Sequence, residues 1–78
     1  MTITIKFSDN IKHNYNKFEE IIRLDNYNDI RYIDCWNSGL FNLPKLPNSL
    51  IVLRCSINNL STLPELPNSI TELMCYNN

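Results

Sequence analysis

Residues 43–62 read LPKLPNSLIVLRCSINNLST and residues 63–78 read LPELPNSITELMCYNN, so one phrase occurs twice in tandem with a period of 20 residues. Self-similarity at a fixed period of this size is typical of solenoids, in which each repeat buries an apolar edge against its neighbour. Counting back by the same period finds a weaker copy at about residues 23–42, where Ile33 and Cys35 take the places of Leu53 and Cys55. The sequence therefore predicts three stacked turns, the last one incomplete.

The second turn carries the spacing L-x-x-L-x-C-x-x-N-x-L, which is the leucine-rich-repeat pattern with cysteine at one apolar position. In the second turn we expect a short strand at residues 52–56, with Leu53 and Cys55 facing inward and Val52, Arg54 and Ser56 facing solvent. Equivalent strands should stack in parallel. Pro44 and Pro47 fix the backbone before the strand, so the return side of the turn should be extended and polyproline-like, without a helix.

The form LPNS-[L/I]-x-x-L-x-C-x-x-N resembles the leucine-rich-repeat proteins of giant viruses and, more distantly, those of secreted bacterial effectors, whose repeats carry L-P-x-L-P. The resemblance covers about residues 30–78. It implies a leucine-rich-repeat solenoid that binds a protein partner and carries out no reaction. A viral origin would make host proteins the candidate partners and the host cytoplasm the compartment.

The first 29 residues match the repeat only loosely, and within a single domain of residues 1–78 they are expected to form an N-terminal cap. Alternating apolar residues predict a strand at about residues 2–7. A helix is predicted at about residues 17–24, with Asn16 as its N-cap and Glu19 completing a capping box. Such a unit would cover the apolar edge of the first turn. The alternative is a helix that binds a partner on its own.

Composition excludes several classes of function. Seven basic and eight acidic residues give a net charge of -1 with no basic cluster, which disfavours nucleic acid and anionic membranes. No apolar run approaches the roughly 20 residues of a membrane span, and the N-terminus lacks the apolar stretch of a signal peptide. Three cysteines, an odd number, fit a reducing compartment, so we expect a cytoplasmic protein without a cofactor.

Two columns of the repeat are expected to lie inside the turns. The first is polar, and a buried asparagine there must bond to backbone groups of the loop. The second is a line of thiols, interpreted as core packing; a disulfide between neighbouring turns and a metal site are the alternatives, and zinc is disfavoured because its ligands converge tetrahedrally. His13, the only histidine, is placed in a solvated loop. The two columns are Ser38, Asn58, Asn78 and Cys35, Cys55, Cys75.

The solvent-facing strand positions form further columns, on the concave side where such folds present binding residues. Aromatic residues and arginine are enriched among the residues that dominate protein interfaces. Two alternatives give this face no binding role: an ion pair between Asp34 and Arg54, and packing of Trp36 against the cap. The candidate protein-binding residues are Tyr32, Asp34, Trp36, Arg54, Met74 and Tyr76.

The leading functional hypothesis is a non-catalytic protein-recognition module. The second is a truncated or degenerate repeat product without a dedicated partner, which self-associates through the exposed edge of its last strand. An enzyme is a distant third, because no motif places His13 or a cysteine beside a catalytic partner.

Overall fold

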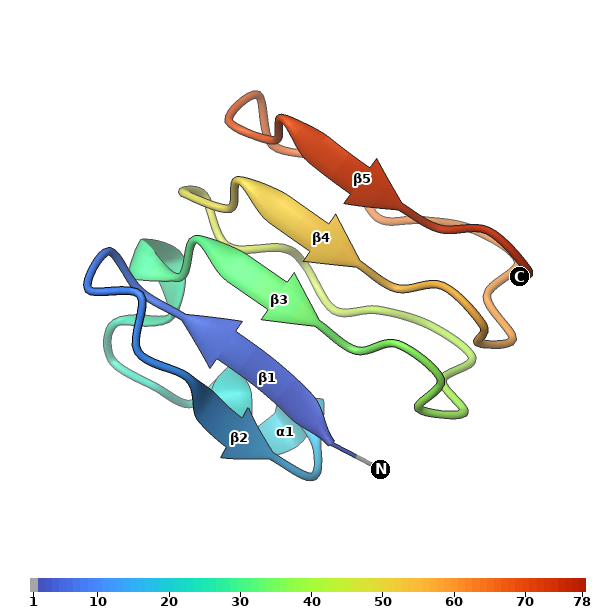
Figure 1. The fold of residues 1–78 in the computed structure, drawn as a ribbon, viewed down its shortest axis with the longest axis horizontal. Helices are drawn as coiled ribbons and strands as arrows, with labels where there is room; N and C mark the ends of the chain where they lie inside the picture. Colours follow the sequence, from blue (N-terminus) through green and yellow to red (C-terminus); the bar gives the residue numbers. More distant parts are fainter. Residues whose placement is uncertain (1) are drawn as a thin grey trace.

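The computed structural model describes residues 2–78, and all of its strands belong to one mixed sheet of order β2-β1-β3-β4-β5 (Figure 1). β1 pairs antiparallel with both β2 and β3, whereas β3, β4 and β5 are parallel. A single α-helix and a 3-10 helix connect the antiparallel part to the parallel part. The elements are β1 (Ile3–Lys6), β2 (His13–Tyr15), α1 (Phe18–Ile21), η1 (Tyr27–Asp29), β3 (Tyr32–Asp34), β4 (Val52–Arg54) and β5 (Glu72–Met74).

The parallel strands pair in the register that the repeat period predicts. Ile33 lies opposite Leu53, and Leu53 lies opposite Leu73, each a step of 20 residues. A step of an even number of residues keeps every column on one face of the sheet. The strands are shorter than the predicted residues 52–56, because the backbone enters a left-handed conformation at Ile57 and leaves the pleat before it.

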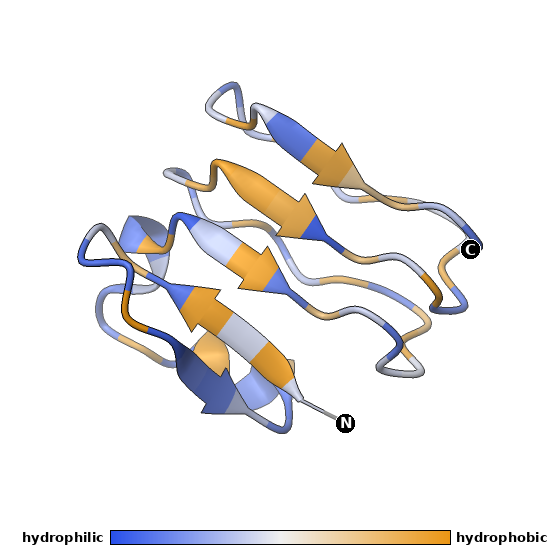
Figure 2. Cartoon of the chain, viewed as in Figure 1, coloured by the Kyte–Doolittle hydropathy of each residue, from blue (hydrophilic) through white to orange (hydrophobic). Residues whose placement is uncertain are grey.

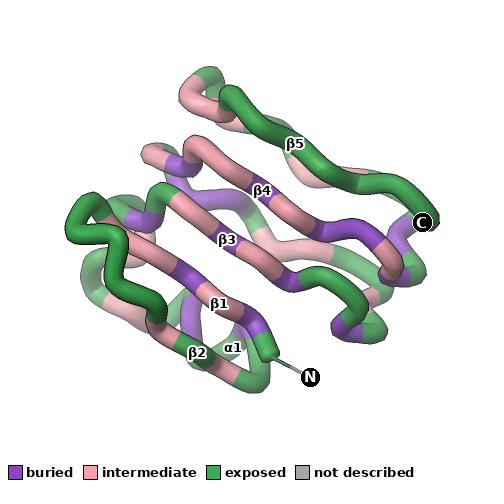
Figure 3. The backbone as a smooth tube through the Cα atoms, viewed as in Figure 1, coloured by how far each residue is buried: buried purple, intermediate pink, exposed green. Residues whose placement is uncertain are grey.

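The core lies behind the sheet, between the strands and the return segments of the turns. Ile33, Cys35, Leu53 and Cys55 are each 0% exposed, and they alternate with half-buried residues on the other face. Figure 2 shows hydrophobic segments in β1, β3, β4 and β5, whereas β2 is hydrophilic. Figure 3 shows that burial stops at β4, because every residue of β5 is exposed.

The cap differs from the prediction in its helix. α1 lies within the predicted range of about residues 17–24 but spans only four residues. Its N-cap is Lys17 and no side chain caps it, so the predicted capping box from Asn16 and Glu19 is wrong. The chain continues in tight turns into η1, because the following Asp25 and Asn26 favour turns over helix. Burial raises the pKa of Tyr27 in η1, whose hydroxyl donates a hydrogen bond to the carbonyl of Lys45.

β2 was not predicted, and it changes the position of His13. This residue belongs to the strand, is half-buried, and packs edge-on against Phe7 with 5.6 Å between ring centroids. The expectation of a solvated loop was therefore wrong. Three residues of sequence HNY carry too little apolar periodicity to indicate a strand, which forms because β1 offers it a pairing edge.

One column has a left-handed backbone in all three turns, with φ of 51° at Asn37, 56° at Ile57 and 56° at Asn77. Asparagine tolerates this conformation, whereas a residue with a branched Cβ is strained in it by about 1–2 kcal/mol. The second turn therefore carries a local cost that the other two avoid.

Candidate functional site

A pocket of about 270 Å³ lies on the solvent-facing side of the parallel strands, on the face predicted to bind a partner. Each of the three turns contributes two side chains to it. Five of the six candidate residues line it, and the sixth lining residue is Ser56, which lies one period of 20 residues after Trp36 and one before Tyr76. The lining residues are Asp34, Trp36, Arg54, Ser56, Met74 and Tyr76.

The charged residues of the pocket pair differently from the expectation. Arg54 donates through Nε and Nη2 to one carboxylate oxygen of Glu72, at 3.2 and 3.0 Å, so the alternative of an ion pair between Arg54 and Asp34 is wrong. This hydrogen bond raises the pKa of Arg54, which stays charged. Both side chains are more than two-fifths exposed, so solvent screening keeps the contribution of this pair to stability small.

Asp34 is engaged locally instead. One carboxylate oxygen accepts a hydrogen bond from the backbone N–H of Trp36 at 3.1 Å, and the other accepts one from the hydroxyl of Tyr32 at 3.4 Å. The first bond closes a turn at the end of β3. Asp34 therefore fixes the backbone from which the Trp36 side chain projects.

The two aromatic walls are held by their backbones and open to solvent. Trp36 is 52% exposed and Tyr76 is 53% exposed, so about half of each side chain is open to solvent. The backbone N–H of Tyr76 donates a hydrogen bond to the hydroxyl oxygen of buried Ser56 at 3.2 Å. The backbone N–H of Trp36 is held in a similar way by the carboxylate of Asp34. Both rings therefore project from backbone that is already ordered.

Tyr32 lies beside the pocket and does not line it. The ammonium group of Lys6, from β1, lies over the ring of Tyr32 at 4.3 Å from its centroid, and the guanidinium carbon of Arg54 lies 5.6 Å from the same centroid. Burial raises the pKa of Tyr32, and the charge of Asp34 adds to the effect. The pairing of β1 with β3, which was not predicted, brings Lys6 to this position.

The polar column makes the hydrogen bonds expected of a buried asparagine. Oδ1 of Asn58 accepts from the backbone N–H groups of Ser38 and Leu40 at 2.9 and 3.0 Å. Its Nδ2 donates to the carbonyls of Cys35, Cys55 and Ser56 at 3.0, 3.0 and 3.3 Å. Asn58 thus ties the first turn to the second.

Asn78 repeats this arrangement one turn later. Its Oδ1 accepts from the N–H of Leu60 at 3.2 Å, and its Nδ2 donates to the carbonyls of Cys55 and Cys75 at 3.1 and 3.0 Å, and to that of Tyr76 at 3.3 Å. The first member of the column differs, because the Ser38 hydroxyl bonds only the carbonyl of Trp36, two residues away.

All three thiols are free, but they are not equivalent. Burial raises the pKa of Cys35 to about 12 and that of Cys55 to about 11, so both stay protonated and unreactive at neutral pH. Cys75 is exposed, which contradicts its predicted place in the core. Within residues 2–78, no three side chains of His, Cys, Asp or Glu gather as metal ligands would.

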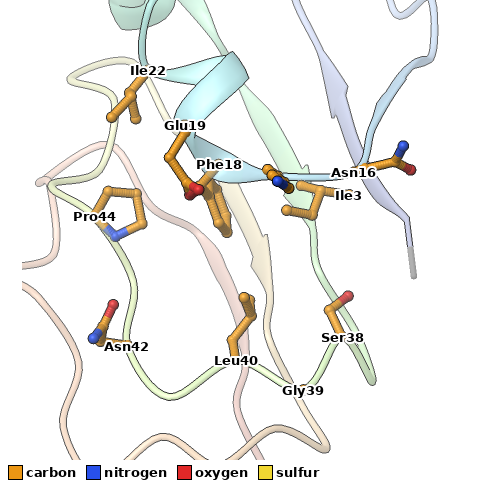
Figure 4. Close-up of a pocket in the computed structure, with 11 residues that line it drawn as sticks. Ile3, Asn16, Phe18, Glu19, Ile22, Ser38, Gly39, Leu40, Asn42 and Pro44 are labelled. Carbon is orange, nitrogen blue, oxygen red and sulfur yellow. The ribbon is translucent and has the colours of Figure 1, made fainter.

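A second cavity, of about 370 Å³, separates the cap from the loop that follows β3. Phe18 and Leu40 point toward one another there, with Pro44 and Ile22 to one side (Figure 4). Phe18 belongs to the core and Leu40 packs against it. We therefore attribute this cavity to incomplete packing between the cap and the first turn. The repeat pattern gave no signal for it, because it depends on how α1 meets a loop outside the strand columns.

Comparison with known proteins adds no assignment: the chain matches no protein-family model, no curated protein and no solved structure. In the described part of the chain, residues 2–78, no helix has the length and apolar character needed to cross a bilayer.

Proposed function

We propose that the chain is a non-catalytic protein-recognition module of the leucine-rich-repeat class, and that its partner binds over the pocket between Trp36 and Tyr76. The observation that carries the proposal is the composition of that pocket, in which three consecutive turns each supply two side chains. Binding by a rigid row of strand residues that the core does not need is the general mode of stacked repeats.

The chemistry of the pocket favours a protein partner. Two half-exposed aromatic rings, a methionine and an arginine are residue types enriched in interfaces. Glu72 already neutralises Arg54, so a partner that covers Arg54 does not leave its guanidinium group as an isolated charge. A volume of about 270 Å³ is below the usual range of small-molecule sites, about 300–1,000 Å³, and suits one or two side chains of a partner.

The test is affinity capture from host-cell lysate under reducing conditions, since the viral resemblance suggests a host partner. The native chain is compared with a variant carrying Trp36→Ala, Arg54→Ala and Tyr76→Ala. A matched control carries Ile11→Ala, Ile22→Ala and Phe41→Ala, three exposed apolar residues outside the pocket. Circular dichroism confirms that all three proteins are folded.

We expect the native chain and the control to retain the same protein in stoichiometric amount, and the pocket variant to lose it. Loss of two or more interface anchors typically weakens binding by more than about 100-fold. Equal capture by the pocket variant and the native chain would place recognition elsewhere. Capture of nothing by any of the three would remove the support for a recognition module.

A further inference from the structure

The outer edge of β5 has backbone groups ready to pair. β5 bonds to the preceding turn through the N–H of Glu72, donated to Ile51, and the carbonyl of Met74, which accepts from Cys55. Successive residues of a strand point these groups to opposite edges, so those of Leu73 and Cys75 point outward. No strand within residues 2–78 pairs with that edge.

The side chains at the same end are apolar and uncovered. Leu73 is 37% exposed, whereas Leu53 and Ile33, its equivalents in the other turns, are 0% exposed. The opposite end of the core is closed, because β1 and α1 bury Ile3 and Ile21 there to 2% and 0% exposure. Figure 3 shows the contrast as an exposed β5 against buried segments at the other end. The open end is therefore specific to β5.

β5 lacks most of the usual guards of an edge strand. Natural edge strands are kept apart by short length, lysine, proline or inward-pointing charge, and of these β5 has only its length of three residues. β5 has the sequence ELM, and its one charged residue, Glu72, is neutralised by Arg54 on the solvent-facing side. Two such edges can approach without like-charge repulsion.

We propose that a second copy of this chain covers this edge, with the two β5 strands pairing antiparallel about a two-fold axis perpendicular to the sheet. To be covered, this edge needs backbone groups that pair with its own and apolar side chains that pack against its core. The same edge of a second copy supplies both. In the register with Met74 on the axis, Leu73 lies opposite Cys75 of the second copy. Each hydrogen-bonded pair of residues exchanges two N–H···O bonds, so the two equivalent pairs of Leu73 and Cys75 form four hydrogen bonds between the copies.

The other free edge, that of β2, fits this role poorly. Its sequence HNY is polar, and α1 packs against β2 and closes the core beneath it. Pairing of β5 with β2 would also build an open-ended chain of molecules instead of a closed pair. The two-fold arrangement instead continues one sheet with both pockets on the same face. It does not depend on those pockets being binding sites.

The size of the end face sets the strength of the association. The molecule measures 30 × 26 × 18 Å. The face of the molecule at its β5 end, bounded by two of these dimensions, has an area of about 500 Å². A dimer formed through it buries about 1,000 Å² in total, at the low end for specific interfaces. The dimer should therefore be weak and dependent on concentration.

The test is sedimentation equilibrium of the 78-residue chain under reducing conditions, from low micromolar to millimolar concentration. We expect the mass to rise from 9.2 kDa toward twice that value. Leu73→Lys, which puts an inward charge on the edge, should abolish the rise. The matched control Ile11→Lys, at a residue 57% exposed in the loop between β1 and β2, should not. A native chain that stays monomeric, or a folded Leu73→Lys variant that still dimerises, overturns the proposal.

A second measurement decides the case in which Leu73→Lys does not fold. Residues opposite each other at a position without hydrogen bonds lie about 4.5 Å apart between Cα atoms, within the range of a disulfide. We therefore expect Met74→Cys, in a Cys75→Ser background, to form disulfide-linked dimers at least tenfold faster than Phe41→Cys in the same background. Equal rates would exclude this edge as the interface.

Discussion

Removal of the Asn58 side chain tests how the turns are held together. In an Asn58→Ala variant, the backbone N–H groups of Ser38 and Leu40 and the carbonyl of Cys35 lose the partner that Asn58 supplied. The carbonyls of Cys55 and Ser56 keep other donors, from Asn78 and from the backbone of Asn37. Three groups are therefore left unpaired near the core.

Each buried group left without a partner costs about 1–3 kcal/mol, and water entering the space left by the side chain favours the lower value. We expect a loss of about 3 kcal/mol in the free energy of unfolding. A domain of this length has only about 4–12 kcal/mol in total. Asn58→Ala should therefore remove a large fraction of the stability of the chain.

Asn78→Ala is the matched control, because it removes an equivalent set of hydrogen bonds from the same column. Asn78 is exposed, so water replaces the lost partners, and we expect a cost below about 1 kcal/mol. The assay is urea unfolding at one fixed protein concentration, followed by circular dichroism and by the fluorescence of Trp36, the only tryptophan. The urea midpoint of Asn58→Ala should fall by about 1–3 M, given the usual slope for small proteins. Equal shifts for both variants would refute the reasoning that burial sets the cost.

Three further predictions follow from the backbone and the thiols. Ile57→Asn, which places in the second turn the residue that the other two turns carry at φ above 50°, should raise the free energy of unfolding by about 0.5–1 kcal/mol in urea titrations; a loss of stability would show that packing of Ile57 outweighs its strain. An alkylating reagent at pH 8 should modify one thiol per native chain, Cys75, and three in urea, as counted by mass spectrometry; rapid labelling of two or three thiols in the native state would contradict the burial of Cys35 and Cys55. Folding raises the pKa of Cys35 to about 12 and that of Cys55 to about 11, from an ordinary value of 9.0, so these thiols should leave the free energy of unfolding level below pH 9 and lower it between pH 9 and 12. The double variant Cys35→Ala, Cys55→Ala should flatten this part of the pH profile, and a decrease that stays the same in the variant would assign it to other groups.

The period of 20 residues predicted the register of the parallel strands, because residues one period apart in the sequence lie opposite each other in neighbouring strands. Five residues of the pocket could be named in advance for this reason. Ser56 was predicted to face solvent but is buried at the pocket, because its hydroxyl accepts the hydrogen bond that holds the backbone of Tyr76, and the strand pattern does not reveal this bond.

The failures lie outside the repeat or depend on its neighbours. α1 and β2 are three or four residues long, and tertiary pairing decides elements of this size more than local pattern does. Arg54 pairs with Glu72 instead of Asp34 because Asp34 is held by a turn that the alternation of strand residues does not reveal. Cys75 is exposed because a core position is buried only where a following turn covers it.

The most direct test of the proposed recognition face is nuclear magnetic resonance mapping of the amide groups of the ¹⁵N-labelled chain, titrated with the purified protein that the chain captures. The account predicts that the largest shifts fall on Trp36, Arg54 and Tyr76 and their strand neighbours, with little change at Ile11 and Phe41. Shifts centred on the loop that contains Phe41, or on the cap, would contradict it.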